Sequence, residues 1–295
     1  MIKQRWNALS SLGYLNSIIL FLKLVLHKLR IISLRNDSLF NQYSNLVFLE
    51  KHNIKYKKEN CESILCNGND SKSQSPALLR LSDSDVFVFH QIYISKEYKP
   101  LVQIYQSHFG MQPKVIIDAG ANIGLTATYL ASHFPSAQII CLEPDESNFN
   151  QLKRNIELCN HAHFHLIQKA LWSSDRDLSI HRNFRDKQSW SLQVAPASQN
   201  QSFVSGISVS SLIKHFEIEQ IDIFKIDIEG AEGEIFKDRK IALSFLSLVK
   251  TIALEIHEDI VEKLPIEQVL MDAGFKLFRA GESIFGVNEH HFKPE

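Results

Sequence analysis

A glycine-containing turn follows a short apolar run in the segment Val115-Ile-Ile-Asp-Ala-Gly-Ala-Asn-Ile-Gly124. Gly120 and Gly124 permit a tight turn and a close approach of the backbone to a ligand, and Asp118 ends the preceding strand with a carboxylate. The spacing differs from the Gly-x-Gly-x-x-Gly pattern with which nicotinamide enzymes cradle a pyrophosphate. The turn therefore predicts a site for a nucleoside without phosphates, with an ordinary strand-to-helix turn as the alternative.

A second carboxylate, Glu143, ends the next apolar run and is followed by Pro144. A carboxylate at the end of a strand can accept hydrogen bonds from both ribose hydroxyls. Because nicotinamide enzymes also carry an acid at this place, Glu143 indicates a ribose and not one particular cofactor. A solvated surface glutamate is the alternative.

Three carboxylates crowd the end of a later strand, where Asp227, Glu229 and Glu232 follow an apolar run that begins at Ile221. One of them can cap a helix N-terminus, which favours acids, but three caps in six positions are not expected. We expect Asp227 to face the ligand. A metal site made of the three acids is an alternative, but the spacing is irregular and we expect no metal.

A histidine and a glutamate end another apolar run, Ile252-Ala-Leu-Glu-Ile-His257. Alternation along a strand places Glu255 and His257 on the same face. Because histidine titrates near neutral pH, His257 is a candidate general base, although a structural hydrogen-bonding role is the alternative.

The elements that position these residues alternate between short apolar runs and amphipathic segments from residue 114 onward. This alternation predicts a doubly wound α/β fold, in which a mostly parallel sheet is covered by helices on both faces. Ligands of such sheets bind beyond the carboxyl ends of the strands. We expect seven strands, the last two antiparallel, over residues 115–119, 138–142, 163–168, 221–227, 249–256, 275–279 and 283–287, and helices over 126–134, 147–159, 209–216 and 266–273.

Three other segments have less regular patterns. Residues 57–76 are polar and predict a linker or loop, and residues 78–89 predict a strand–turn–strand. Residues 182–208 have no clear period and predict a long loop on the ligand side of the sheet. Within it, Trp190 is a candidate to stack on an acceptor ring, with packing inside the loop as the alternative.

The first 36 residues carry only basic charges, with the first acid at Asp37. Apolar residues recur at helical spacing between Tyr14 and Leu29, and helical pattern continues to about residue 55. Basic residues interrupt the apolar run too early for a membrane-spanning helix, and no signal-peptide cleavage site follows. We expect a basic amphipathic helix packed on the catalytic domain. The alternatives are an interfacial helix on an anionic inner leaflet and an uncleaved anchor.

The composition is that of an ordinary globular protein, with 295 residues, 44% of them hydrophobic, and a formal net charge of −1. A net charge this close to zero excludes the overall excess of basic residues that many nucleic-acid-binding proteins carry, and we expect no nucleic-acid partner. The four cysteines are scattered and predict reduced thiols in a cytosolic protein.

These segments resemble the FkbM family of S-adenosylmethionine-dependent methyltransferases across roughly residues 78–290. The most specific element is Lys225-Ile-Asp-Ile-Glu-Gly-Ala-Glu232. A segment from Asp83 and Asp85 to Tyr98 is similar to the family's lead-in to the glycine turn. The other matching elements are Asp118 to Gly124, Glu143-Pro144, the helix with Asn148, Phe149 and Asn155, and Glu255-Ile-His257.

The resemblance implies a class I methyltransferase Rossmann-like fold and S-adenosylmethionine as the cofactor. The implied reaction is O-methylation of a hydroxyl on a saccharide or other small molecule. The implied cofactor-binding residues are Asp118, Gly120 and Gly124 toward the methionine part, Glu143 toward the ribose and Asp227 near the transferring methyl group. Asn122 and Pro144 also belong to the implied cofactor-binding set.

We therefore expect a methyltransferase domain over residues 76–295 behind a basic, amphipathic helical extension over residues 1–75. His257 or Asp227 is the expected general base, oriented by Glu229 or Glu255. We expect a cytoplasmic location. Peripheral contact with the inner membrane, through residues 1–36, is compatible with that location. The alternatives are a nicotinamide dehydrogenase and a non-catalytic, membrane-associated S-adenosylmethionine-binding scaffold or sensor.

Overall fold

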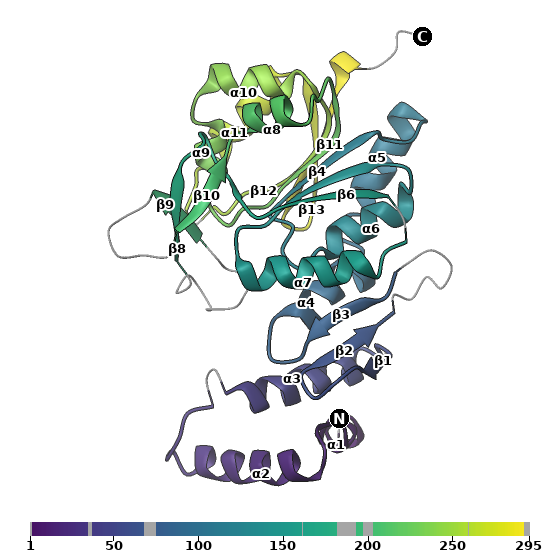
Figure 1. Ribbon diagram of the computed structural model, residues 1–295, viewed down its shortest axis with the longest axis vertical. Coiled ribbons are helices and arrows are strands. Elements are labelled where there is room, and N and C mark those ends of the chain that lie inside the picture. The colour runs from purple at the N-terminus through teal and green to yellow at the C-terminus, as the bar shows by residue number, and fades with distance from the viewer. Residues whose placement is uncertain are drawn as a thin grey trace.

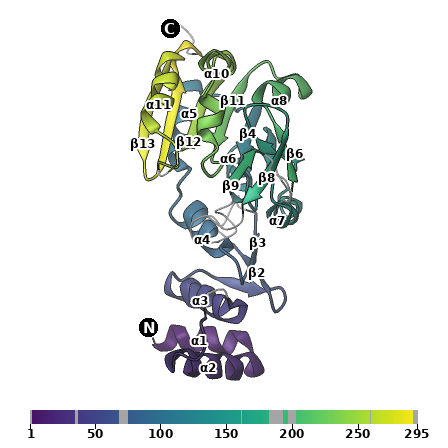
Figure 2. The ribbon, with the colours of Figure 1, turned by 90° about the vertical axis from the view of Figure 1, so that its left-hand side faces the viewer.

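The computed structural model describes residues 2–34, 37–67, 75–160, 162–181, 193–196, 203–258 and 260–291. Three layers follow one another along the long axis of the molecule (Figure 1). N-terminal helices occupy one end, a small antiparallel sheet comes next, and a large sheet flanked by helices occupies the other end. The view turned by 90° shows the same succession (Figure 2).

The large sheet has seven strands in the order β13-β14-β12-β11-β4-β5-β6. Strand β14 runs antiparallel to both of its neighbours and the other pairs are parallel, as expected for the class I methyltransferase fold. The strands are β4 (Val115–Ala119), β5 (Gln138–Leu142), β6 (His163–Ile167), β11 (Ile221–Ile226), β12 (Val249–Glu255), β13 (Phe275–Ala280) and β14 (Ser283–Asn288). All seven expected strands are confirmed.

Helices cover both faces of this sheet (Figure 1). Successive strand residues point to opposite sides, so apolar side chains stand on both faces and both need to be covered. Ile116 and Ile223 pack in one hydrophobic cluster, whereas Ile117 and Phe224 pack in the other. The first cluster lies under α5 (Lys99–Phe109), α6 (Leu125–His133) and α7 (Glu146–Glu157). The second lies under α8 (Val209–His215), α9 (Glu232–Phe236), α10 (Arg239–Leu246) and α11 (Lys263–Asp272).

The N-terminal helices α1 (Ile2–Leu12), α2 (Tyr14–Lys28) and α3 (Ser38–Lys51) confirm the helical pattern expected before residue 55. Asp37 caps α3 by accepting a 3.0 Å hydrogen bond from the backbone N–H of Phe40. The expected packing of the amphipathic helix on the catalytic domain is wrong. Helix α2 lies at the far end of the molecule from the large sheet (Figure 1) and buries Leu20 against the other two helices.

The polar segment 57–76 is not only a loop, which corrects the prediction. It contributes to a three-stranded antiparallel sheet of β1 (Tyr56–Lys58), β2 (Ser63–Cys66) and β3 (Ala77–Arg80). Strand β2 is short and set among polar residues, so its apolar pattern is weak, but it buries Ile64. The β2–β3 pairing crosses the predicted boundary at residue 75, and that division of the chain stays a prediction.

Two further predictions need correction. After β3 the chain forms α4 (Asp85–Phe89) and the π-helical turn η1 (His90–Ile94), because Val86, Phe89 and Tyr93 are buried at helical spacing.

The predicted loop 182–208 contributes β9 (Gln193–Pro196) and β10 (Phe203–Ile207), which form a four-stranded sheet with β7 (Ala170–Leu171) and β8 (Asp177–His181). Trp190 lies outside the described residues.

Within the described part of the chain, no helix has the length and apolar character needed to cross a bilayer. All four cysteines are free thiols.

Candidate active site

A cavity of about 330 Å³ opens beyond the carboxyl ends of β4, β5, β11 and β12, where α4 and η1 face the sheet. Parallel strands place the residues that follow them at this edge, so segments far apart in the sequence converge here. Eight of the predicted site residues line the cavity: Gly120, Asn122, Glu143, Pro144, Asp227, Glu229, Glu255 and His257. Asp118 and Gly124 do not line it.

The glycine turn brings two parts of the backbone together at the edge of the cavity. Gly120 has φ 75°, and a Cβ atom there would lie 1.7 Å from the carbonyl oxygen of Asp227. Only glycine tolerates both the left-handed backbone and this approach. Gly124 has φ 84° and precedes the first turn of α6, so it shapes the entry to the helix and does not line the cavity.

The Glu143 carboxylate is buried and held by the backbone. Its Oε2 accepts a 2.8 Å hydrogen bond from the N–H of Asn122, and its Oε1 accepts a 2.9 Å bond from the N–H of Asp145. Burial raises the pKa of Glu143 to about 7, although both hydrogen bonds favour the ionised form. Each oxygen keeps a second lone pair, so the carboxylate can accept further bonds from a pair of hydroxyls.

Lys225 is a buried residue whose role the sequence analysis missed. Its Nζ donates a 2.6 Å hydrogen bond to the carbonyl of Gly120 and lies 3.2 Å from Asp118 Oδ1 and 3.5 Å from Asp227 Oδ2. Burial alone would lower the pKa of Lys225, but the charges of Asp118 and Asp227 outweigh it and hold the pKa well above its usual range. Asp118 is fully buried and does not line the cavity. It acts on the cavity through its ion pair with Lys225, which does line it. A lysine between Phe224 and Ile226 in a buried strand was the available signal.

His257 is buried among carboxylates from two elements. Its Nδ1 lies 2.9 Å from Glu232 Oε1, and its Nε2 lies 3.3 Å from Glu229 Oε2 and 3.7 Å from Glu255 Oε1. Burial alone would lower the pKa of His257, but the hydrogen bond to Glu232 and the surrounding charges raise it to about 9. At neutral pH the ring is therefore an imidazolium, whose Nδ1 donates a hydrogen bond to Glu232 and whose Nε2 lies at ion-pair distance from Glu229 and Glu255.

Further carboxylates gather around the imidazolium. The charge of Asp227, followed by burial, raises the pKa of Glu255 to about 8. Burial, followed by the same charge, raises the pKa of Glu97. We call this part of the cavity the acidic end, formed by Glu97, Asp227, Glu229, Glu255 and Glu282.

The acidic end also has the geometry of a possible metal site. Asp227, Glu229 and His257 each offer a ligand atom, and these atoms lie within 4.8 Å of one another. Glu232, which the sequence analysis weighed as a third ligand, instead holds the far side of the imidazole ring. A metal ion would have to displace the proton on the imidazole Nε2, because a histidine ligand must be neutral there.

The segment before the large sheet covers the cavity and is fastened to it. Gln91, Ile92 and Tyr98 line the cavity from η1 and the residues that follow. The hydroxyls of Tyr93 and Thr128 lie 2.8 Å apart and join η1 to α6. The sequence analysis did not identify these covering residues as part of the site.

Polar side chains fasten β3 to the glycine turn and to α7. Asn155 donates to the carbonyl of Ile123 at 2.8 Å and accepts from the N–H of Leu78 at 2.7 Å. Arg80 donates to Asn148 at 2.9 Å and pairs with the buried Asp85 at 2.7 Å. These contacts fix the covering segment relative to the glycine turn at the edge of the cavity.

Comparisons with known proteins agree with this geometry. Residues 118–277, more than half of the chain, match the family model described as the methyltransferase FkbM domain. Methyltransferase sdnD of Sordaria araneosa is 25% identical over 196 residues, which cover 56% of this chain and 74% of that protein. Methyltransferase 1 of Beauveria bassiana (strain ARSEF 2860) is 25% identical over 142 residues, which cover 41% and 57% respectively.

Among solved structures, similarity extends to magnesium protoporphyrin IX methyltransferase from Synechocystis PCC 6803 with bound S-adenosylmethionine. The TM-score is 0.40 at 13% sequence identity, over 70% of this chain and 83% of that chain.

Proposed function

Because the chain belongs to the FkbM methyltransferase family, whose cofactor is S-adenosylmethionine, we propose that it methylates a hydroxyl group on a saccharide or another small molecule. The observation that carries this proposal is the acidic end of the cavity, which lies beside the residues suited to the cofactor. The family match also removes the nicotinamide dehydrogenase from consideration.

The residues of the glycine turn and Glu143 fit the cofactor. The Glu143 carboxylate is oriented by two backbone N–H groups and retains lone pairs for the two ribose hydroxyls. Gly120 lets the glycine turn approach the backbone of Asp227 closely, and both Gly120 and Asn122 line the cavity. These residues would hold the nucleoside, and Asp227 would lie toward the reacting group.

The acidic end supports a neutral acceptor with several hydroxyl groups. Carboxylates only accept hydrogen bonds when ionised, and each sugar hydroxyl can donate one. The same negative charges would repel a phosphorylated acceptor or a nucleic-acid backbone. A saccharide or polyhydroxylated small molecule therefore matches this end of the cavity better than an anionic acceptor does.

S-adenosylmethionine supplies a methyl group that its sulfonium already activates, so the protein has to position the acceptor oxygen, exclude water and take up the hydroxyl proton. His257 is protonated at neutral pH and is therefore a poor base. We assign proton uptake to the interacting carboxylates of Asp227 and Glu255. The His257 imidazolium holds Glu229 and Glu255 in place through its Nε2.

The test is transfer of a radioactive methyl group from S-adenosylmethionine to matched acceptors. Neutral methyl glycosides are compared with the same glycosides carrying a phosphate ester and with fully O-methylated forms. We expect an alkali-stable methyl ether on the neutral glycosides and little label on the other two. Label on an amine or a carbon would contradict O-methylation, and binding of the cofactor without any transfer would favour the non-catalytic scaffold.

A further inference from the structure

The outer surface of α2 is a broad apolar face. Tyr14, Leu15 and Phe21 are 85%, 69% and 64% exposed, which is unusual for side chains of this kind. We call the following set the α2 apolar face: Tyr14, Leu15, Ile18, Ile19, Phe21, Leu22, Val25, Leu26 and Leu29. At 100° per residue the set covers a continuous arc of about 160° around the helix.

The opposite side of α2 completes the packing of the N-terminal helices. Leu20 is fully buried and Leu24 is partly buried, in a hydrophobic cluster that includes Ala8 of α1 and Leu46 and Leu49 of α3. Because the narrow side of α2 already meets its neighbours, the wide α2 apolar face is left on the outside of the molecule.

The charged side chains of the first 36 residues, which include α2, are all basic. Lys3, Arg5, Lys28 and Arg30 are exposed, and no acidic residue occurs before Asp37. Lys23, which borders one edge of the arc, is paired with Asp37 at 2.5 Å, and Lys28 borders the other edge. The α2 apolar face is thus set in basic surroundings.

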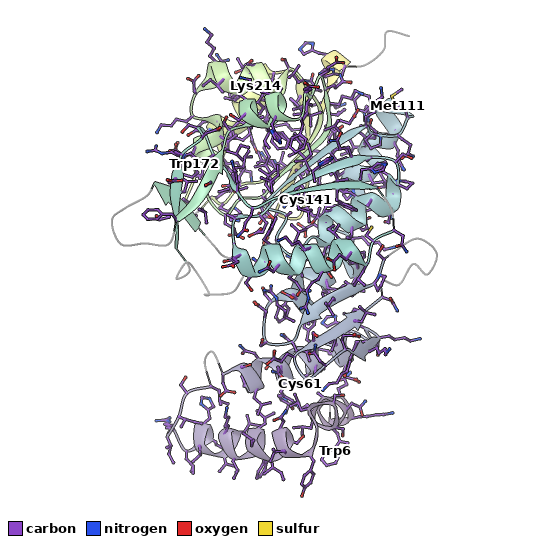
Figure 3. The ribbon with its side chains drawn as sticks, viewed as in Figure 1. Trp6, Cys61, Met111, Cys141, Trp172 and Lys214 are labelled. Atoms are coloured by element: carbon purple, nitrogen blue, oxygen red, sulfur yellow. The ribbon has the colours of Figure 1, made fainter. Side chains whose placement is uncertain are left out.

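An exposed tryptophan lies at the same end of the molecule. Trp6 is 70% exposed and belongs to α1, which packs against α2 (Figure 3). Tryptophan is enriched where proteins meet the boundary between lipid and water. An apolar arc, flanking cations and an adjacent tryptophan together are the features of a helix that lies in the plane of an anionic bilayer.

We propose that α2 docks the protein on an anionic lipid bilayer, with its apolar face among the upper acyl chains and its basic neighbours against the lipid headgroups. Helix α2 has 15 residues and does not cross the bilayer. A second copy of the chain is a poorer occupant, because a symmetric contact through this face would bring the basic residues of both copies together. The large sheet lies at the other end of the long axis (Figure 1), which leaves the cavity clear of the bilayer surface.

The proposal is tested by vesicle flotation of the full chain. Vesicles contain phosphatidylcholine alone or phosphatidylcholine mixed with phosphatidylserine. We expect flotation with the mixed vesicles and at least about tenfold less binding to the neutral vesicles, because each basic residue near an anionic surface contributes about fivefold in affinity. Raised salt should weaken the binding but not abolish it, since the apolar contact is not screened.

Two variants separate the apolar and electrostatic contributions. Leu15→Glu/Leu22→Glu places charges at the centre of the α2 apolar face and should abolish flotation. Lys28→Glu/Arg30→Glu should reduce it by at least tenfold. The matched controls are Leu264→Glu on α11, whose leucine is 77% exposed, and Lys237→Glu after α9, and both should float like the wild type.

Folding and oligomeric state are followed on the same proteins. Thermal unfolding and S-adenosylmethionine binding should be unchanged in all four variants, because none of the residues lies at the cavity. Three results would overturn the proposal: wild type that does not float with the mixed vesicles, Leu15→Glu/Leu22→Glu protein that floats as well as wild type, or a wild-type dimer that this variant dissociates.

Discussion

The Nζ atom of Lys225 lies 2.6 Å from the carbonyl oxygen of Gly120, so a buried ammonium joins the end of β11 to the glycine turn after β4. The parallel pairing of these strands sets Lys225 opposite Asp118, which supplies the compensating charge. The same ammonium lies 3.5 Å from Asp227. One side chain therefore links the cofactor side of the cavity to the acidic end.

Replacement of this lysine should damage both the fold and the cofactor site. In Lys225→Met, the fully buried Asp118 loses its charge partner, and the free energy of unfolding should fall by about 3–5 kcal/mol. The glycine turn also loses its anchor, so the affinity for S-adenosylmethionine should fall at least about tenfold. Urea unfolding and calorimetric titration at low temperature measure the two effects.

Lys250→Met is the matched control. Lys250 forms a partly buried ion pair with Asp222 at 2.7 Å, but neither residue lines the cavity. This variant should lose stability while its S-adenosylmethionine affinity is unchanged, and Lys225→Met/Asp118→Asn should recover part of the lost stability. Wild-type cofactor affinity in folded Lys225→Met protein would show that the ammonium does not position the turn.

Glu143 offers a sharper test of cofactor binding. Glu143→Gln keeps the size of the side chain but turns one oxygen into an NH₂ group that meets a backbone N–H of Asn122 or Asp145. We expect a loss of about 1–3 kcal/mol, which is a Kd increase of roughly fivefold to 150-fold for S-adenosylmethionine. Glu157→Gln, on the exposed side of α7, is the control and should bind normally.

The pKa of Glu143, about 7, adds a pH dependence to this binding. The ionised carboxylate is the better acceptor for ribose hydroxyls, so wild-type affinity should rise as the pH increases through 7. Glu143→Gln has no proton to lose and should show a flat profile over the same range. An equally steep profile in the variant would remove Glu143 from the ribose site.

Turnover should have a bell-shaped pH profile centred above neutrality. The pKa of Glu255 is about 8, and a base works only after losing its proton, so kcat/KM should rise through that pH. The pKa of His257 is about 9, so the ring loses its positive charge above that pH. The neutral ring no longer holds the carboxylates of Glu229 and Glu255 in place, so kcat/KM should then fall. The two limbs belong to a coupled group of residues, and initial rates between pH 6 and about 10 would measure them.

Two variants assign the limbs. Glu255→Gln should lose the rising limb, and His257→Gln should lose the falling limb while keeping a hydrogen-bonding side chain of similar reach. The control Glu258→Gln changes an exposed neighbour whose carboxylate pairs with Lys263, and its pH profile should match the wild type. Unchanged limbs in both active-site variants would place the base elsewhere.

The inner strands of the large sheet were predictable because they are buried on both faces. Every residue of β11 is buried, and four of its six residues are apolar, which gives the strand a recognisable pattern in the sequence. Once the strands are known, the topology alone brings Gly120, Glu143, Asp227 and His257 to one edge. Much of the cavity lining therefore follows from local pattern and a general rule about parallel sheets.

The remaining features depend on contacts between distant segments. Lys225 and Gly120 are 105 positions apart, so no local pattern reveals their hydrogen bond. The helical form of residues 85–94 depends on burial of Val86, Phe89 and Tyr93, whereas their apolar run also suits a strand. Which side of α2 is covered depends likewise on its packing with α1 and α3.

The acidic end leads to a last prediction, that methyl transfer does not require a metal ion. Asp227, Glu229 and His257 are close enough to share an ion, but Glu232 and the other carboxylates favour a proton on His257 up to about pH 9. A divalent ion would have to displace that proton, whereas the imidazolium already supplies a positive charge to the carboxylates. Initial rates after purification with a chelator should agree within about twofold with and without added EDTA, Mg²⁺ or Mn²⁺. A rate that Mg²⁺ or Mn²⁺ restores at least about tenfold in wild type, and fails to restore in Glu229→Gln, would instead assign the three side chains as metal ligands.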